Sequence, residues 1–280
     1  MLRAIVRSMI AQLPFGLKYE LFYQAGRSLG VTSYQVAGEQ GTFFGSLSDQ
    51  SVIKPYLRHG KWSENLIELF EQFFARSDAG TFYDVGANIG LTLLPIAKNK
   101  SVRCIGFEPD PANFGLLSAN IVGNSASQIE IRNVAVADRA GELRFTRNVF
   151  NSGDHRLSAD GEIVVQTIAL DDLPFPENPL AIKIDTQGAE PLIFAGGKRQ
   201  LAAAGLIVCE FWPWGMKRMG NSPDRLLSFV EEFSGSCFVI KHEDDAHVPL
   251  TSGQALAELN KVIARGGEYD AVDLVLMKVS

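Results

Sequence analysis

The segment with the clearest chemical potential is a glycine-rich turn, FYDVGANIG, at positions 82–90. An apolar run typical of a strand precedes it, and a helical pattern follows it. Glycine lets a backbone approach a ligand closely, and the first N–H groups of a helix lack partners. Asp84 adds a carboxylate at the end of the predicted strand, where open α/β sheets bind ligands. We therefore expect Asp84, Gly86, Asn88 and Gly90 to surround a ligand.

A second carboxylate, Glu108, ends the next predicted strand, 22 residues after Gly86, where it can bind the two hydroxyls of a ribose. We expect its side chain to be open to solvent without ligand. Dinucleotide-binding turns follow G-x-G-x-x-G, but Asn88 and Leu91 replace the second and third glycines. S-adenosylmethionine has no phosphate and carries a cationic end that suits Asp84. The spacing thus favours a methyltransferase, with a nicotinamide-dependent oxidoreductase or a non-catalytic binding protein as alternatives.

Methyl transfer to a hydroxyl needs a group that takes the proton, and three segments offer one. Asp185 and Glu190 lie in IKIDTQGAE, at the end of a predicted strand and the start of a helix. Glu210 ends the following strand, and His155 lies in a polar segment that could cover the site. Ordinary structural roles compete with these: a helix cap for Asp185, a first-turn acid for Glu190, an ion pair for Glu210, and an exposed loop position for His155.

The elements that must position these residues alternate between strand and helix, which predicts a parallel sheet with crossover helices. The predicted strands are 81–85, 102–107, 129–137, 181–185, 206–211, 238–241 and 271–279, and the predicted helices are 91–98, 112–121, 190–204 and 224–233. Two further strands, 142–147 and 162–170, predict an antiparallel insertion. For residues 1–78 the pattern predicts a helical extension with a loop at 38–49. Residues 79–280 are predicted to form the methyltransferase domain. We expect the extension to cover the cofactor or to shape the acceptor cleft of that domain.

Several segments in this order resemble the FkbM-type methyltransferases: FYDVGANIG, GFEPDP, NVAVAD, TIALDDL, IKIDTQGAE and CEFWP. The resemblance implies a class I Rossmann-like fold, a seven-stranded, mostly parallel sheet with an antiparallel last strand. It implies S-adenosylmethionine as cofactor and O-methylation of a hydroxyl on a saccharide, glycolipid or natural product. It also implies that Asp84, Gly86, Asn88 and Gly90 surround the methionine part, that Glu108 binds the ribose, and that Asp138 meets the adenine edge.

Composition limits the partners. The chain has 280 residues and a net charge of −6, which argues against an extended nucleic-acid-binding face. Three separated cysteines in apolar runs argue against a disulfide framework and favour the cytoplasm. No segment has the ~20 apolar residues of a membrane span, although the weakly basic N-terminus is compatible with a helix on a membrane surface.

His242 to His247 lack zinc spacing, so no metal is expected. Trp212 and Trp214 form either a wall for a sugar ring or part of the core.

Overall fold

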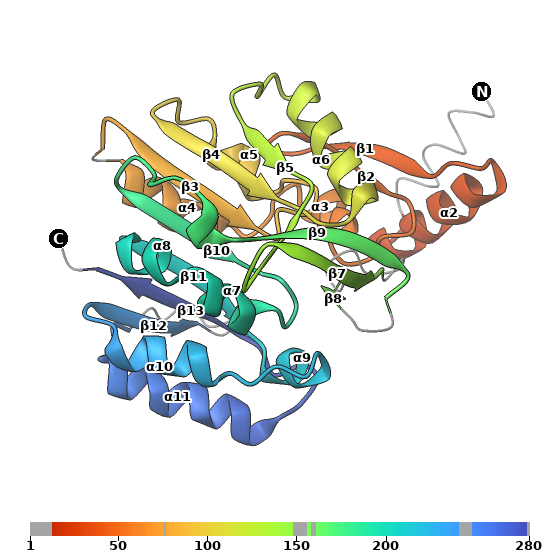
Figure 1. The fold of residues 1–280 in the computed structure, drawn as a ribbon. Coiled ribbons are helices and arrows are strands. Elements are labelled where there is room, and N and C mark those ends of the chain that lie inside the picture. The colour runs from red at the N-terminus through yellow and green to blue at the C-terminus, as the bar shows by residue number, and fades with distance from the viewer. Residues whose placement is uncertain (1–12, 76, 148–155, 158–160, 241–247, 279–280) are drawn as a thin grey trace, which may run out of the picture.

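The computed structural model describes residues 13–75, 77–147, 156–157, 161–240 and 248–278. Within them a seven-stranded sheet has the order β12-β13-β11-β10-β3-β4-β5 (Figure 1). Its strands are β3 (Gly80–Val85), β4 (Val102–Phe107), β5 (Glu130–Arg132), β10 (Leu180–Ile184), β11 (Leu206–Phe211), β12 (Ser236–Ile240) and β13 (Val272–Met277). β13 is antiparallel to both neighbours, and the pairs among β5, β4, β3, β10 and β11 are parallel. The predicted fold class is confirmed.

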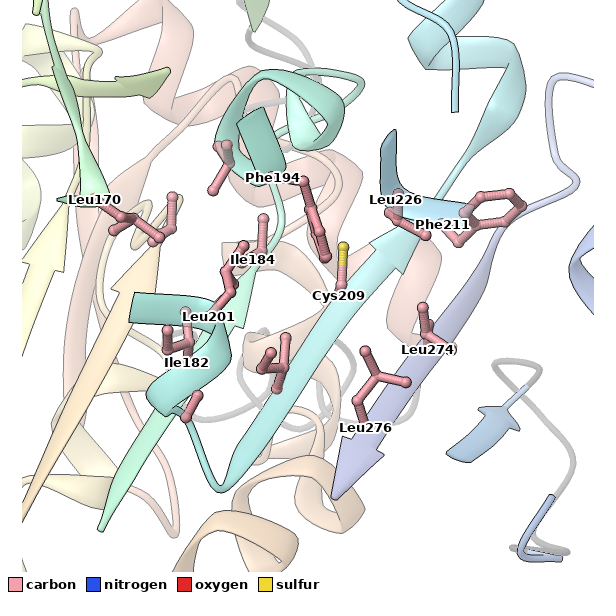
Figure 2. Packing of buried hydrophobic residues seen from close by; sticks show 14 of the residues in the cluster. Leu170, Ile182, Ile184, Phe194, Leu201, Cys209, Phe211, Leu226, Leu274 and Leu276 are labelled. Carbon is pink, nitrogen blue, oxygen red and sulfur yellow. The ribbon is translucent and has the colours of Figure 1, made fainter. Parts of the chain in front are cut away.

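Helices cover both faces of this sheet because alternate strand residues point to opposite sides. One face packs against α4 (Glu64–Phe74), α5 (Leu93–Ile96) and α6 (Pro111–Gly123). The other packs against α7 (Glu190–Gly196), α8 (Lys198–Ala203), α10 (Asp224–Glu232) and α11 (Ser252–Arg265). Figure 2 shows strand residues Cys209 and Leu274 in this second core, with Phe194 and Leu226 from the helices.

One predicted helix is interrupted, and two helices of the structure were not predicted. The predicted helix 190–204 is interrupted between α7 and α8, where Gly196 lies so close to the carbonyls of Ala137 and Asp138 that a Cβ would collide with them. α9 (Pro213–Arg218) and α11 were not predicted. None of the helices in the described part of the chain is long and apolar enough to cross a bilayer.

The N-terminal extension is not wholly helical, so that prediction is wrong. It contains α2 (Phe15–Ser28), α3 (Ile53–His59) and α4, but also an antiparallel hairpin of β1 (Ser33–Ala37) and β2 (Thr42–Ser46). Only β2 falls within the predicted loop 38–49. The hairpin depends on a tertiary partner. Asn120 on α6 accepts from Phe44 N at 2.6 Å and donates to Phe44 O at 3.1 Å, and Asn124 makes the same pair of bonds with Thr42. The domain boundary at 78/79 stays a prediction.

The insertion forms a second sheet with the order β6-β9-β7-β8. Its strands are β6 (Ala135–Ala137), β7 (Gly141–Thr146), β8 (Arg156–Leu157) and β9 (Ile163–Ala169). β7 and β9 are antiparallel, as predicted, whereas the single predicted strand 129–137 is divided between β5 and β6. Arg147 Nε lies 2.5 Å from Asp110 Oδ2, and Asp110 caps α6 by accepting from Ala112 N and Asn113 N. This ion pair holds the end of β7 beside the carboxyl edge of β4.

Candidate functional site

A cavity of about 420 Å³ lies at the carboxyl ends of β3, β4, β10 and β11. The glycine-rich turn, the loop after β4 and the loop after β10 form most of its wall, and the N-terminal extension closes one side. Its lining includes Ser51, Val52, Trp62, Ser63, Leu66, Asp84 to Ile89, Phe107 to Pro109, Val134 to Val136, Phe145, Lys183 to Gln187, Glu210 and Asp273. This is the edge at which open α/β sheets bind ligands.

The turn after β3 shows why glycine is needed there. Gly86 has φ 83°, and a Cβ on it would collide with the carbonyl oxygen of Asp185. Gly90 has φ 92°, and a Cβ there would collide with Leu94 on α5. Gly86 lines the cavity, whereas Gly90 is absent from its described lining. Both glycines therefore permit close packing of the turn, and the structure does not bring Gly90 to the ligand position that the sequence predicted.

Asn88 takes the left-handed conformation, with φ 50°, at the position where a dinucleotide motif has its second glycine. Its backbone N–H donates to Glu108 Oε2 at 2.9 Å. The turn is therefore tied to the end of β4, and this N–H is directed at a carboxylate.

Glu108 is 4% exposed, so the prediction of a solvent-open side chain is wrong. Besides Asn88, it accepts a hydrogen bond from Asp110 N to Oε1 at 2.8 Å. Burial raises the pKa of the Glu108 carboxyl to about 8, although these two backbone N–H groups act in the opposite direction. Glu108 is thus a preorganised, buried carboxyl group at the wall of the cavity.

A buried ion pair lies at the centre of the site. Asp84 on β3 and Lys183 on β10 are register partners, and Lys183 Nζ lies 3.2 Å from Asp84 Oδ1 and 3.6 Å from Asp185 Oδ2. Burial lowers the pKa of Lys183, but the carboxylates of Asp84 and Asp185 outweigh it and raise that pKa overall. Burial also raises the pKa of Asp84, opposed by Lys183. Asp84 is thus the nearer of the two carboxylates that pair with Lys183.

Three carboxylates stand side by side beyond this pair. Glu210 on β11 is in register with Asp273 on β13, and Asp185 follows the last residue of the adjacent β10. Burial raises the pKa of Glu210 well above its usual range, and the nearby charge of Asp185 adds to this effect. A carboxyl group with a raised pKa beside a second carboxyl group is an arrangement that can divide acid and base roles.

Gln187 connects two of these carboxylates. Its Nε2 donates to Asp185 Oδ1 at 3.0 Å and to Glu210 Oε2 at 2.8 Å. Its backbone has φ 60°, a left-handed conformation that is uncommon for a residue other than glycine. Strained residues of this kind persist where the surrounding structure requires them, and they cluster at functional sites.

Other predicted site residues lie elsewhere. Glu190 is fully buried in the first turn of α7, where its Oε1 accepts from Thr186 N and Oγ1, both at 2.9 Å; it is outside the described cavity lining. Asp138 is exposed, lies 3.6 Å from Arg139, and is also outside that lining, because the chain has already left the cavity along β6. His155 lies outside the described residues.

The two tryptophans after β11 are not part of the described lining either. Trp212 and Trp214 have ring centroids 5.3 Å apart, and the guanidinium of Arg218 lies over both rings. Trp212 Nε1 donates to Glu268 O at 2.7 Å. Both rings thus belong to the packing of α9. Among the described residues no group of three or more His, Cys, Asp or Glu could hold a metal ion, and His242 to His247 lie outside them.

Sequence reasoning missed part of the site. Trp62, Ser51 and Asp273 line the cavity but come from the extension and from the antiparallel last strand. No motif marks them, because tertiary packing alone brings them to the carboxyl edge of the parallel strands. Gln187 offered a weak signal, since it lies between two candidate acids, Asp185 and Glu190.

Comparison with known proteins agrees with this geometry. Residues 84–234, more than half of the chain, match the family model described as the methyltransferase FkbM domain. The hexuronic acid methyltransferase AglP of Haloferax volcanii is 28% identical over 133 residues, which cover 46% of this chain and 54% of that protein. The chain thus aligns with about half the length of this relative.

Two solved structures resemble the fold more distantly. A precorrin-6y C5,15-methyltransferase from Geobacter metallireducens is 13% identical, with a TM-score of 0.39 over 78% of this chain and 93% of that one. An rRNA methylase from Streptococcus thermophilus is 10% identical, with a TM-score of 0.42 over 78% and 99%. The family match covers the turn after β3, the carboxyl end of β4 and the acids after β10. The chain has a class I Rossmann-like fold, and it belongs to the family of the methyltransferase FkbM domain.

Proposed function

We propose that the protein is a methyltransferase that takes its methyl group from S-adenosylmethionine and transfers it to a hydroxyl of a saccharide or glycolipid. The observation that carries the cofactor assignment is the charge of the cavity. Its described lining contains five carboxyl groups and one lysine: Asp84, Glu108, Asp185, Glu210, Asp273 and Lys183. The three aspartates alone outnumber the lysine, so a pyrophosphate would meet an excess of negative charge, whereas a sulfonium with an ammonium group is attracted. The same property disfavours a nicotinamide dinucleotide.

The hydrogen-bonding groups and apolar side chains of the cavity also suit S-adenosylmethionine. Glu108 would accept from the ribose hydroxyls, since each of its oxygens has lone-pair capacity beyond the one backbone bond it makes. Gly86 and Asn88 would lie beside the methionine part, and Val134 and Ala135 would form an apolar wall for the adenine. When bound, the cofactor supplies an electrophilic methyl group on a sulfonium.

Asp185 is the base that the geometry favours. Its side chain is 42% exposed at the cavity, and Lys183 and Gln187 hold one oxygen each. Glu210 is less suited to this role, because desolvation and the neighbouring acids raise its pKa well above the usual range. Asp185 is therefore placed to accept the proton of an acceptor hydroxyl that approaches from the open side. Glu190 contacts Thr186 instead, and in this proposal it is a structural support of the loop.

The acceptor class rests on the family and on its relative. The aligned protein from Haloferax volcanii is named for a sugar acid acceptor. The acidic row beside Asp185 is less suited to an acceptor whose carboxylate lies next to the reacting hydroxyl, because like charges repel. We therefore propose a saccharide that presents neutral hydroxyls at this row.

Isotope labelling tests this proposal. The purified protein is incubated with ¹³C-methyl S-adenosylmethionine and a glycan and glycolipid extract of the source cells, and the product is examined by NMR and mass spectrometry. The expected product carries the label on a sugar oxygen. The substitution Asp185→Asn is expected to keep cofactor affinity and to lower the single-turnover rate by about 10²–10⁴-fold, the usual contribution of a general base. A label on nitrogen or carbon would contradict the proposal.

His155 is the competing base and is tested in the same assay. Its side chain lies outside the described residues, so its role stays a prediction from sequence. The substitution His155→Ala is expected to lower the rate less than Asp185→Asn, with cofactor affinity unchanged. The reverse order of the two effects would transfer the role of base to His155.

A further inference from the structure

The helix α2 presents apolar side chains that stay largely exposed in the described part of the chain, although Phe22 packs edge-on against Tyr34. Leu17 and Leu21 are each 49% exposed, Phe22 is 40% exposed, and Leu29, just after the helix, is 80% exposed. Leu17 and Leu21 are one turn apart and lie opposite Tyr19 and Gly26, the two buried residues of the helix. Figure 1 shows α2 at the periphery of the molecule. We refer to Leu17, Leu21, Phe22 and Leu29 as the α2 face.

Two basic side chains of α2 flank Leu17 and Leu21, and two basic side chains of α3 lie on the packed side of α2. Lys18 and Arg27 lie on α2 itself. Lys54 and Arg58 on α3 lie over the aromatic rings of Tyr19 and Phe15, with their charged groups 4.4 Å and 5.7 Å from the ring centroids.

Within α2 and α3 only Glu20 carries an acidic side chain, although the whole chain has a net charge of −6. A local positive charge on an acidic protein, placed around exposed leucine and phenylalanine, is complementary to anionic lipid headgroups above an apolar interior.

We propose that α2 docks the protein on an anionic lipid bilayer, with the α2 face inserted at the headgroup boundary. α3 begins directly after Ser51 and Val52, which line the cavity. α3 in turn contacts α2 through Tyr19 and Phe15. Docking through α2 therefore brings the cavity near the bilayer surface, where a lipid-linked saccharide would present its hydroxyls. This last step rests on the proposed function, whereas bilayer binding does not.

Vesicle flotation with the full chain tests the docking surface. Wild-type protein is mixed with vesicles of phosphatidylcholine alone or with 30 mol% phosphatidylglycerol. Binding is expected to the anionic vesicles and to weaken with added salt. The double substitution Leu17→Glu and Leu21→Glu is expected to reduce the partition coefficient by about tenfold or more, because it removes inserted apolar area and adds like charge. Lys18→Gln with Arg27→Gln is expected to reduce it by a smaller factor.

A matched control places the same charges on other exposed apolar positions. Val122 on α6 is 79% exposed and Val164 on β9 is 54% exposed, and Val122→Glu with Val164→Glu is expected to leave binding unchanged. Calorimetry with S-adenosylhomocysteine and thermal unfolding monitor the cofactor site and the fold of each variant. Because flotation needs neither cofactor nor acceptor, its failure and that of the proposed function are separable.

Three results would overturn the docking proposal. The first is wild-type protein that does not float with anionic vesicles. The second is a Leu17→Glu and Leu21→Glu variant that binds as well as wild type, which would assign binding to residues 1–12. The third is a wild-type dimer that this double variant converts to monomer in light scattering, which would assign the α2 face to a second copy of the chain.

Discussion

Gln187 combines a side chain that is hydrogen-bonded to two carboxyl groups of the site with a left-handed backbone conformation. Its amide lies between Asp185 and Glu210 while its backbone holds φ 60°. The substitution Gln187→Gly removes the amide and suits the left-handed conformation. We therefore expect an unfolding free energy equal to or above that of wild type, together with a loss of about tenfold or more in the single-turnover rate, since a misplaced base loses part of its effect.

The control for this prediction is Gln187→Asn, which keeps an amide and tolerates the left-handed region. It is expected to retain more activity than the glycine variant. A Gln187→Gly protein with wild-type turnover would show that the amide does not position Asp185.

Because Glu108 is buried, the free energy of unfolding is expected to depend on pH. The folded-state pKa of Glu108, about 8, lies above that of an unfolded glutamate, so the folded state holds the extra proton between about pH 4.5 and 8. The contribution of Glu108 to the free energy of unfolding is complete below about pH 4.5. It is lost as the pH rises towards 8, by at most about 1.4 kcal/mol per pH unit. Urea unfolding between pH 5 and 9 should show a shallower decline for Glu108→Gln than for wild type. Equal slopes would contradict a raised pKa.

At the scale of elements, the hairpin and α6 depend on each other. Asn120 satisfies the backbone of Phe44 and also donates to Ile89 O at 2.9 Å in the turn after β3. Asn120→Ala leaves these groups without partners in a fully buried position, so we expect a loss of about 1–3 kcal/mol in the free energy of unfolding. Ser118→Ala on the same helix is the control, because its hydroxyl bonds only within α6. Equal urea midpoints for both variants would contradict this role.

Helices and strands that have a clear local pattern of apolar residues could be predicted from the sequence. Strands whose hydrogen bonds depend on residues distant in the sequence could not. β4 and β11 were predicted with their observed bounds, because a buried parallel strand is a continuous apolar run between turns. The hairpin of β1 and β2 was missed because Asn120 on α6 and Asn124 just after it, about 80 residues away, complete the hydrogen bonding of β2. Likewise Asp84, Asp185 and Glu210 were found because each lies at or just beyond a strand end, while Asp273 was missed within an antiparallel strand.

At the scale of the whole molecule, the acidic side chains of the site lie together at the carboxyl ends of the parallel strands. Asp84 and Lys183 form one row of register partners, and Glu210 and Asp273 form the next. The strand order brings these rows under α4 and the loop before it, which contribute Leu66 and Trp62 to the cavity. The electrostatic character of the site is therefore a property of the fold, and the choice between a cationic and a phosphorylated cofactor tests it directly.

Calorimetry of cofactor binding is the most direct measurement of this central claim. S-adenosylmethionine, S-adenosylhomocysteine, NAD and NADP are titrated separately into the full chain at pH 7. The account predicts saturable one-to-one binding of S-adenosylmethionine and its demethylated product, weakened in Glu108→Gln. It predicts NAD and NADP affinities lower by about a hundredfold or more, equivalent to about 2.7 kcal/mol of electrostatic and steric mismatch. Tighter binding of NAD or NADP than of S-adenosylmethionine would contradict the account.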